Sequence, residues 1–273
     1  MKEQELLLTS IILRKGELKM WIEQKPKFFI SAPFGNYIRS EQTISVHGTF
    51  TRNPRGNRLW SVLSTLRYSR KHNGWVNRLG LPNPGLQKGL ASVWDDPQNK
   101  VMSIAETERG DFQKMNHIIP LDQSLEINLS CPNIELLNNI NGSSTLPIDD
   151  AKVFARVKSR KWCIAKLSPL ISPEEIEFII EEMGFRQLHF SNTLPVSGGG
   201  LSGVTLKPFT MKLIDVVRER WGDSIEIIAG GGVTEFGAVS DYLSAGANHV
   251  SIGSVCFNPF KLRKLLKSLE LDV

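Results

Sequence analysis

The stretch from residue 225 to residue 254, "IEIIAGGGVTEFGAVSDYLSAGANHVSIGS", contains two short apolar runs separated by a helical pattern. The runs at 225–231 and 249–254 have the apolar, β-branched composition of buried strands. Between them, residues 234–247 space their apolar side chains along one helical face, and acidic Glu235 lies in the first turn. Two strands joined by a helix run parallel in one sheet. The stretch therefore predicts a strand–helix–strand unit.

The same plan recurs upstream of this unit. Helical patterns occupy 173–184 and 207–222. Six further apolar runs read as strands, at 27–32, 43–48, 100–105, 125–130, 162–168 and 186–192. Alternating strands and helices indicate a parallel sheet, and eight such units close into a (β/α)₈ TIM barrel of class α/β. We expect residues 1–273 to form this single domain, with a β-hairpin at 10–23 turning near Gly16.

Composition and charge limit the function classes. The chain is 41% hydrophobic and 22% charged, as in ordinary soluble globular proteins. A net charge of +5 favours anionic ligands but is too small to indicate nucleic acid. The run "LLLTSIIL" near the N-terminus is too short to span a bilayer and carries no signal-peptide cleavage pattern. The three cysteines have no paired spacing, so we expect no metal site, no membrane partner and a cytoplasmic location.

The segment 49–99, between the second and third strands, is rich in Arg, Gly, Pro and Asn. Ligands of a (β/α)₈ barrel bind where the strands present their C-terminal ends. We therefore expect this insertion to lie over the active face. The alternative is a variable surface excursion.

Glycines follow the last two predicted strands, at 230–232 and again at Gly253 before Ser254. Backbone N–H groups in such turns approach phosphate closely, and the following helix adds partial positive charge. The pattern predicts a phosphate site. The alternative is that the glycines only make tight turns.

Polar residues end three other predicted strands. The fourth ends in "INLSCPN" (127–133), the fifth carries Lys166 between apolar neighbours, and the sixth ends in Asn192 and Thr193 before the glycines of 198–203. A cysteine on an exposed loop acts as a base when its thiolate is accessible, whereas a lone cysteine is more often an inert small hydrophobe, our interpretation of Cys163. For Lys166, a snorkelling surface residue is the alternative to a cavity-lining one.

Taken together, these motifs resemble the dihydroorotate dehydrogenases. The resemblance covers about residues 27–260 and is carried by motifs in the family's order: "NRLGLPNPG", "INLSCPN", "AKLSP", "SNT", "GGGLSG", "AGGGV" and "SIGS". Such enzymes are FMN-containing (β/α)₈ barrels that oxidise dihydroorotate to orotate in pyrimidine (UMP) biosynthesis. A cysteine rather than a serine in "SCPN" is similar to the soluble class, whose members commonly form homodimers, so a homodimer is one expectation.

The resemblance also implies roles for individual residues. Cys131 is the base that takes a proton from substrate C5 while C6 gives a hydride to FMN N5. The implied substrate-binding residues are Asn77, Asn128, Asn133, Asn192 and Thr193. The implied FMN-binding residues are Ser31, Ala32, Asn128, Lys166, Gly203, Gly231, Gly232, Gly253 and Ser254. Lys166 is expected at the flavin N1/O2 edge, where negative charge grows on reduction.

The chain differs from the family at one feature. Members of the family have a lysine near the flavin and the substrate, and this chain has no lysine at the matching positions. Gly48 stands at one such position, and Arg39 and His47 are the neighbouring basic residues. Two alternatives stay open for this reason. One is a related flavoprotein with another pyrimidine substrate, such as uracil reduction of the dihydrouridine synthase kind, although no nucleic acid partner is expected. The other is a flavin-binding barrel without turnover.

Overall fold

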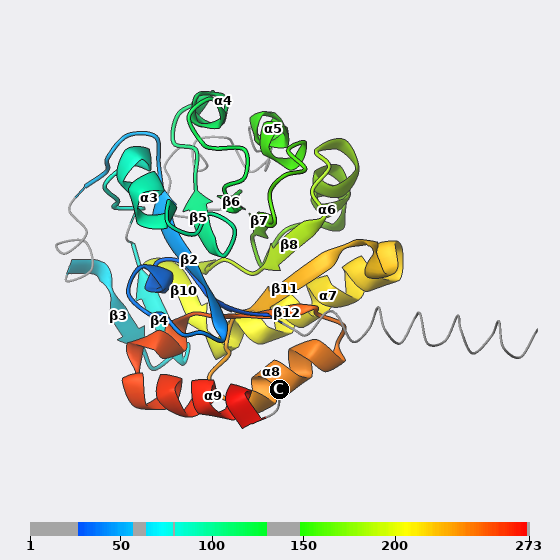
Figure 1. Cartoon of the computed structure of the whole chain (residues 1–273). Coiled ribbons are helices and arrows are strands. Elements are labelled where there is room, and N and C mark those ends of the chain that lie inside the picture. The colour runs from blue at the N-terminus through cyan, green and yellow to red at the C-terminus, as the bar shows by residue number, and fades with distance from the viewer. Residues whose placement is uncertain (1–26, 57–63, 79, 130–147, 272–273) are drawn as a thin grey trace, which may run out of the picture.

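Eight parallel strands form a closed barrel with helices around it (Figure 1). The computed structural model describes residues 27–56, 64–78, 80–129 and 148–271. Around the barrel the strands are β1 (Phe28–Ile30), β12 (His249–Ile252), β11 (Glu226–Gly230), β8 (Gln187–Phe190), β7 (Cys163–Leu167), β6 (Leu125–Asn128), β5 (Lys100–Ile104) and β2 (Thr43–Phe50). All eight predicted strands are present, so the predicted (β/α)₈ architecture is confirmed. The hairpin predicted at 10–23 lies outside the described residues.

Helices surround the strands in Figure 1. They are α3 (Leu86–Val93), α4 (Asp111–Asn116), α5 (Lys152–Ala155), α6 (Pro173–Glu177), α7 (Lys207–Trp221), α8 (Phe236–Ser244) and α9 (Pro259–Leu271). Short 3₁₀ turns occupy Phe34–Asn36, Ile148–Ala151, Val204–Leu206, Gly222–Ser224 and Ser254–Phe257. None of the described helices has the length and apolar composition needed to cross a bilayer.

The start of α6 follows from its sequence. Ser172 Oγ accepts from the Glu175 N–H at 3.2 Å, and the Glu175 carboxylate accepts from the Ser172 N–H at 2.8 Å. This capping box satisfies two of the helix's first N–H groups. The predicted helix at 173–184 changes at Phe178 into a π-helical turn that ends at Glu182.

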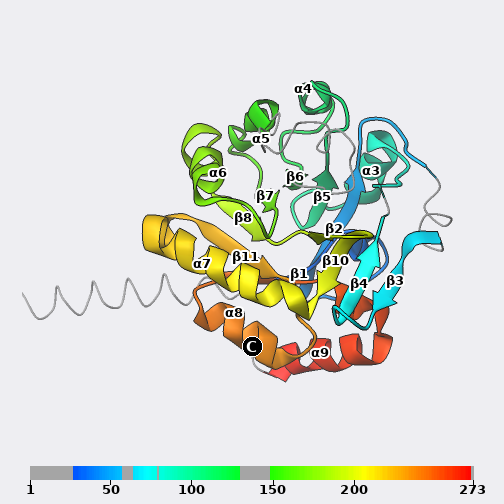
Figure 2. The ribbon, with the colours of Figure 1, turned by 180° about the vertical axis from the view of Figure 1, so that it is seen from behind.

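A second, antiparallel sheet lies beside the barrel (Figures 1 and 2). Its strands, in spatial order, are β3 (Arg67–Ser69), β4 (Gly74–Asn77), β10 (Gly199–Gly203) and β9 (Leu194–Val196). The insertion 49–99 thus supplies half of a sheet, whereas its last part, α3, packs outside the barrel on β2 and β5. Gly199, Gly200 and Gly203 lie in β10, which pairs with β4. A Cβ atom at Gly199 would lie 2.1 Å from the Asn77 carbonyl oxygen, so only glycine permits this close approach of the two strands.

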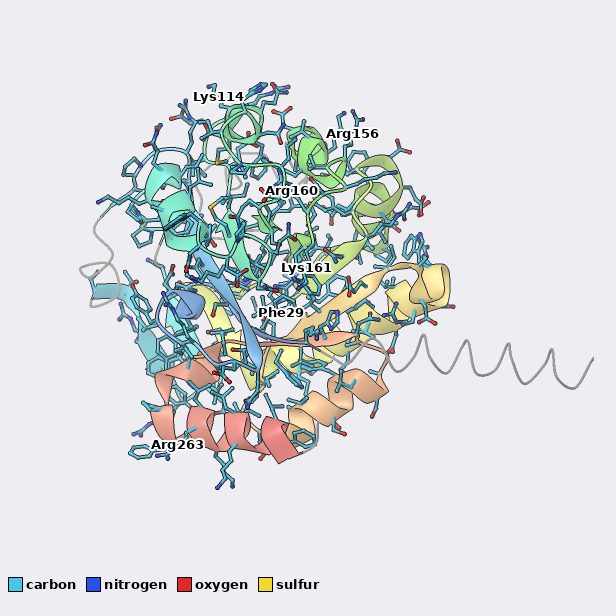
Figure 3. The ribbon with its side chains drawn as sticks, in the orientation of Figure 1. Phe29, Lys114, Arg156, Arg160, Lys161 and Arg263 are labelled. Carbon is cyan, nitrogen blue, oxygen red and sulfur yellow. The ribbon has the colours of Figure 1, made fainter. Side chains whose placement is uncertain are left out.

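The barrel strands alternate between an outer apolar face and an inner face of two layers. Outward residues, such as Ile127 on β6 and Leu167 on β7, pack against the helices in the main core. The lower inner layer contains the apolar cluster Phe29, Val46, Val101, Trp162, Ile164 and Ile228, with the His249 ring packed against Phe29 and Trp162. Figure 3 labels Phe29 near the middle of the molecule and Lys114, Arg156 and Arg263 at its periphery. Above the apolar layer the inner face turns polar, toward the C-terminal ends of the strands.

Candidate active site

A cavity of about 580 Å³ opens at the C-terminal ends of the barrel strands. Its wall includes twelve of the site residues predicted from the sequence: Ser31, Ala32, Asn77, Asn128, Lys166, Asn192, Thr193, Gly203, Gly231, Gly232, Gly253 and Ser254. Leu66, Leu81 and Pro82 of the insertion also line it, so the insertion borders the active face as expected. The predicted base Cys131 and its neighbour Asn133 lie outside the described residues.

One side of the cavity presents side-chain amides. Asn128 ends β6, and Asn192 follows β8; the Asn192 amide donates to Asn128 Oδ1 at 2.9 Å. Asn192 Oδ1 in turn accepts from the Thr193 N–H at 2.9 Å, and the Asn77 amide donates to the Gly200 carbonyl at 3.4 Å. These bonds fix which way each amide points before any ligand arrives. Oriented amides of this kind match the alternating donors and acceptors of a planar heterocycle.

Another part of the cavity wall is the glycine turn after β11, the strand next to β8. Gly231 and Gly232 have φ angles of +92° and +74°. A Cβ atom at Gly232 would lie 2.7 Å from Val204 Cα, and one at Gly231 would lie 2.6 Å from Leu206 Cβ. The turn therefore requires glycine for both its conformation and its packing. This agrees with the tight-turn alternative as well as with a phosphate site, because both need glycine here.

Buried hydroxyl groups hold this turn from below. Tyr242 Oη donates to the Gly231 carbonyl at 2.6 Å and lies 3.1 Å from the Gly230 carbonyl. Thr210 Oγ1 also donates to the Gly230 carbonyl, at 2.9 Å. With its carbonyl oxygens bonded toward the core, the turn is held in a fixed orientation at the cavity wall. Neither hydroxyl was singled out from the sequence.

Beneath the cavity lies a buried charged cluster that we call the inner cluster: Ser103, Glu126, Lys166 and His189. Glu126 is fully buried and accepts from Ser103 Oγ at 2.9 Å, from Lys166 Nζ at 3.4 Å and from His189 Nδ1 at 2.7 Å. Burial by itself would raise the pKa of Glu126, but Lys166, His189 and Ser103 together lower it to about 2. Glu126 is therefore ionised at neutral pH. Lys166 points into the barrel, which excludes the snorkelling alternative.

Sequence reasoning missed Glu126 and His189. A signal was present: Glu126 stands two residues before Asn128 in "LEIN", and His189 alternates with apolar neighbours in "QLHF". Residues i and i+2 of a strand share a face. A polar residue inside an otherwise apolar barrel strand thus marked the inner face in both places.

Gly48 lines the cavity where a family lysine was expected. Its φ angle is +117°, and a Cβ atom there would lie 2.5 Å from the Ser103 carbonyl oxygen, so no larger residue fits this backbone. His47 faces the outside of the barrel instead, with Nδ1 3.2 Å from Ser92 Oγ on α3. Burial, then Lys100 and Arg39, lower the pKa of His47 to about 4, so it is neutral at pH 7. Arg39 thus acts on the outer side of β2, and neither basic neighbour replaces the lysine in the cavity.

An aromatic wall borders the same cavity and was not predicted. Phe34 and Phe257 line it and meet edge-to-face, with ring centroids 4.9 Å apart. Trp75 of β4 packs on Phe257 at 4.6 Å. Flat apolar side chains of this kind favour a planar ligand.

Two described cysteines are protonated thiols at neutral pH. Burial raises the pKa of Cys163 to about 12 and that of Cys256 to about 12. Both remain thiols at neutral pH, and neither belongs to the described cavity wall. The interpretation of Cys163 as a small buried hydrophobe fits these values.

The cavity suits a phosphate-bearing planar cofactor. Its volume falls within the range of roughly 300–1,000 Å³ typical of ligand pockets. Its wall contains glycine turns, oriented amides and the ammonium group of the buried Lys166. Within the described part of the chain, no group of three His, Cys, Asp or Glu side chains is placed to hold a metal ion. The glycine turns, amides and ammonium group fit a planar organic ligand that carries a phosphate.

Comparisons with known proteins indicate one family. The family model described as dihydroorotate dehydrogenase matches residues 46–271. The catalytic subunit of dihydroorotate dehydrogenase B (NAD(+)) from Halalkalibacterium halodurans is 32% identical over 217 residues, which cover 71% of this chain and 70% of that protein. The subunit of the same name from Exiguobacterium sibiricum is 30% identical over 230 residues, covering 75% and 73%.

A solved structure has the same fold. The crystal structure of DHODH from Eimeria tenella in complex with ferulenol superimposes with a TM-score of 0.65 at 20% identity. The match covers 89% of this chain and 80% of that one.

Proposed function

The chain belongs to the dihydroorotate dehydrogenase family, and on that premise we propose that it is an FMN-dependent oxidoreductase that converts dihydroorotate to orotate in pyrimidine (UMP) biosynthesis. The observation that carries the proposal is the shared cavity. The twelve predicted site residues come from eight separate segments, from Ser31 to Ser254, and they all line this one cavity.

The cofactor would be held by the wall residues already described. Gly231, Gly232, Gly253 and Ser254 would bind the phosphate, because their turns bring backbone close to the cavity. Ser31, Ala32 and Gly203 would contact the ring, with Lys166 at its electron-rich edge. When bound, FMN supplies the hydride acceptor that no side chain can provide.

Side-chain amides would bind the substrate. Asn128 and Asn192 are bonded to each other, which sets the donor and acceptor edges that they present. Asn77 and Thr193 complete the described part of this wall. Cys131 and Asn133 follow β6 in the sequence, and we propose Cys131 as the base that removes the C5 proton, with Asn133 as a further ligand of the ring.

One observation favours a second candidate. Gly48 and the Ser103 carbonyl leave no room for a lysine at the cavity wall, so a cation available to the family is missing there. This difference favours an uncharged dihydropyrimidine as the substrate over dihydroorotate, which carries a carboxylate. The activity would then be uracil chemistry of the dihydrouridine synthase kind.

An anaerobic visible spectrum of the purified protein tests both candidates. We expect flavin bands at about 370 and 450 nm, and loss of the 450 nm band when dihydroorotate is added. Loss of that band with dihydrouracil but not with dihydroorotate would favour the second candidate. A flavin that neither compound reduces would favour a binding barrel without turnover, and a protein that takes up no FMN would contradict the proposal.

The assignment of the base is tested by substitution. Cys131→Ser should slow anaerobic flavin reduction near neutral pH by about 100-fold or more, the usual size of a general-base contribution, with FMN affinity retained. Cys163→Ser is the matched control, because that cysteine is part of β7 and does not line the cavity, so its substitution should leave the rate unchanged. Equal rates in both variants would exclude Cys131 as the base.

A further inference from the structure

The inner cluster has no net charge in its resting form. Lys166 and the ionised Glu126 cancel each other, and His189 is the remaining titratable member. Burial lowers the pKa of His189, Lys166 adds to that effect, and hydrogen bonding and attraction by Glu126 oppose it. At rest the cluster is therefore a buried, neutral combination of one anion, one cation and one imidazole.

The hydrogen bond to Glu126 fixes the tautomer of His189. An ionised carboxylate only accepts, so Nδ1, which lies 2.7 Å from Glu126 Oε2, must carry the proton. Nε2 is then left with a lone pair. His189 lines the cavity, and a Cβ atom at Gly230 would lie 3.2 Å from Nε2, which places this nitrogen at the foot of the glycine turn.

The groups around the ring are known from each neighbouring strand. Glu126 faces it from β6 and Lys166 from β7. On the other side lie Gly230 of β11 and, next to that glycine, Ser251 of β12, neither of which is charged. Among the described residues, Nε2 has no hydrogen-bond partner. A negative charge that appears in the cavity would therefore act directly on His189.

Two-electron reduction of a flavin by hydride adds one negative charge to the ring system. The Lys166 charge is already compensated by Glu126, so the resting cluster offers little net attraction to that charge. Protonation of His189 would change the cluster from neutral to +1. Glu126 would then stabilise the imidazolium through a bond that already exists.

We propose that His189 takes up one proton at Nε2 when bound FMN is reduced and releases it on reoxidation, with Glu126 as its counter-ion. The hydride from the substrate carries two electrons and one hydrogen, and the second substrate proton leaves through the base. The proton that His189 gains comes from solvent and balances the added negative charge. This inference rests on the proposed flavin site.

The midpoint potential of the bound flavin, measured against pH, tests the proposal. For a two-electron couple, each proton taken up shifts the potential by about 30 mV per pH unit, since a tenfold change in proton concentration corresponds to that value. We expect about 60 mV per pH unit in the native protein between about pH 6 and pH 8, one proton on the flavin and one on His189. His189→Gln, which keeps an amide donor for Glu126, should lower the slope to about 30 mV per pH unit.

The chain provides a matched control. His249 is also buried and bonded to a carboxylate, with Nε2 2.6 Å from Glu226 Oε1, but it lies away from the cavity. His249→Gln should therefore keep the native slope. If the native slope is only about 30 mV per pH unit, or if His189→Gln keeps the native slope, the proposal is overturned.

Protonation of the reduced flavin at N1 would also give about 60 mV per pH unit, so the assignment to His189 needs the His189→Gln comparison, but the native measurement can overturn the proposal even if that variant does not fold. A native protein that binds FMN but takes up a single proton overturns this inference and leaves the proposed function standing. A protein that binds no FMN overturns both.

Discussion

The two ends of the barrel interior each contain a buried histidine bonded to a glutamate, but the two pairs are connected differently. We call the end where the barrel strands begin the closed end and the end with the cavity the open end. At the closed end, His249 uses both ring nitrogens: Nδ1 accepts from the Lys27 N–H at 3.0 Å and Nε2 lies 2.6 Å from Glu226. At the open end, His189 is bonded to Glu126 through Nδ1 while Nε2 faces the cavity.

The surroundings of the two pairs differ as well. His249 packs against Trp162 and Phe29, with ring centroids 5.4 and 6.0 Å away. His189 has the Lys166 ammonium group as its neighbour. A histidine–glutamate pair stabilises the fold where both ring nitrogens of the histidine are hydrogen-bonded and aromatic rings pack around it. The same kind of pair is available for ligand chemistry where one ring nitrogen faces a cavity.

The largest expected effect lies at the closed end. Phe29 is 1% exposed and meets Trp162 edge-to-face at 5.1 Å. Phe29→Ala should lower the free energy of unfolding by about 3–5 kcal/mol, because it removes a buried ring and leaves a cavity. Urea denaturation measures this. FMN affinity of the folded variant should change by less than about threefold, since Phe29 is not part of the cavity wall. A large loss of affinity would contradict the view that the closed end stabilises the fold and the open end binds the ligand.

A smaller effect is expected when the charges at the open end are separated. Glu126→Gln and Lys166→Met should each lower the free energy of unfolding by about 3 kcal/mol, because each leaves a buried charge without its partner. The double variant should lose less than the sum by at least about 1 kcal/mol. Urea denaturation of all four proteins gives this coupling energy, and additive losses would show that the two charges do not stabilise each other.

The smallest effect concerns the glycine turns at the open end. Gly232→Ala should cost about 1–2 kcal/mol, because its φ angle is +74° and Val204 Cα lies in the way. Gly253→Ala should stay within about 0.5 kcal/mol, since the nearest atom to its Cβ would be Ser31 Oγ at 3.6 Å. Thermal denaturation compares the two, and isothermal titration with FMN should show the larger loss of affinity for Gly232→Ala. Equal losses of stability would contradict the steric argument.

The barrel was predictable from local patterns. The strand at 125–130 alternates Leu125 and Ile127 with polar residues, and the strand at 249–254 carries β-branched residues before a glycine. Such periodicities survive in sequence because each strand buries one face against the helices. Helix ends were less accurate: α8 begins at Phe236 and ends at Ser244, inside the predicted 234–247, because terminal turns depend on tertiary contacts.

The wall of the candidate site was also largely predictable, since its residues follow strands whose C-terminal ends meet at one face. Asn192 was placed at the cavity by this rule alone. The pairing of Gly200 with Asn77 was not predictable, because β4 and β10 are separated by more than a hundred residues and only the second sheet brings them together. The same limit applied to Tyr242, which reaches the Gly231 carbonyl from α8.

The sequence by itself determined the number and order of the barrel strands, the glycine turns after the last two of them and the polar residues at strand ends, because these depend on neighbours a few positions away. Only the tertiary structure decided that Glu126, Lys166 and His189, from three adjacent strands, share one buried network, and that His47 points away from the cavity. The physical reason is that closure of the barrel sets which residues on different strands lie at the same height. Charge balance inside the barrel depends on distances across strands, which no local pattern encodes.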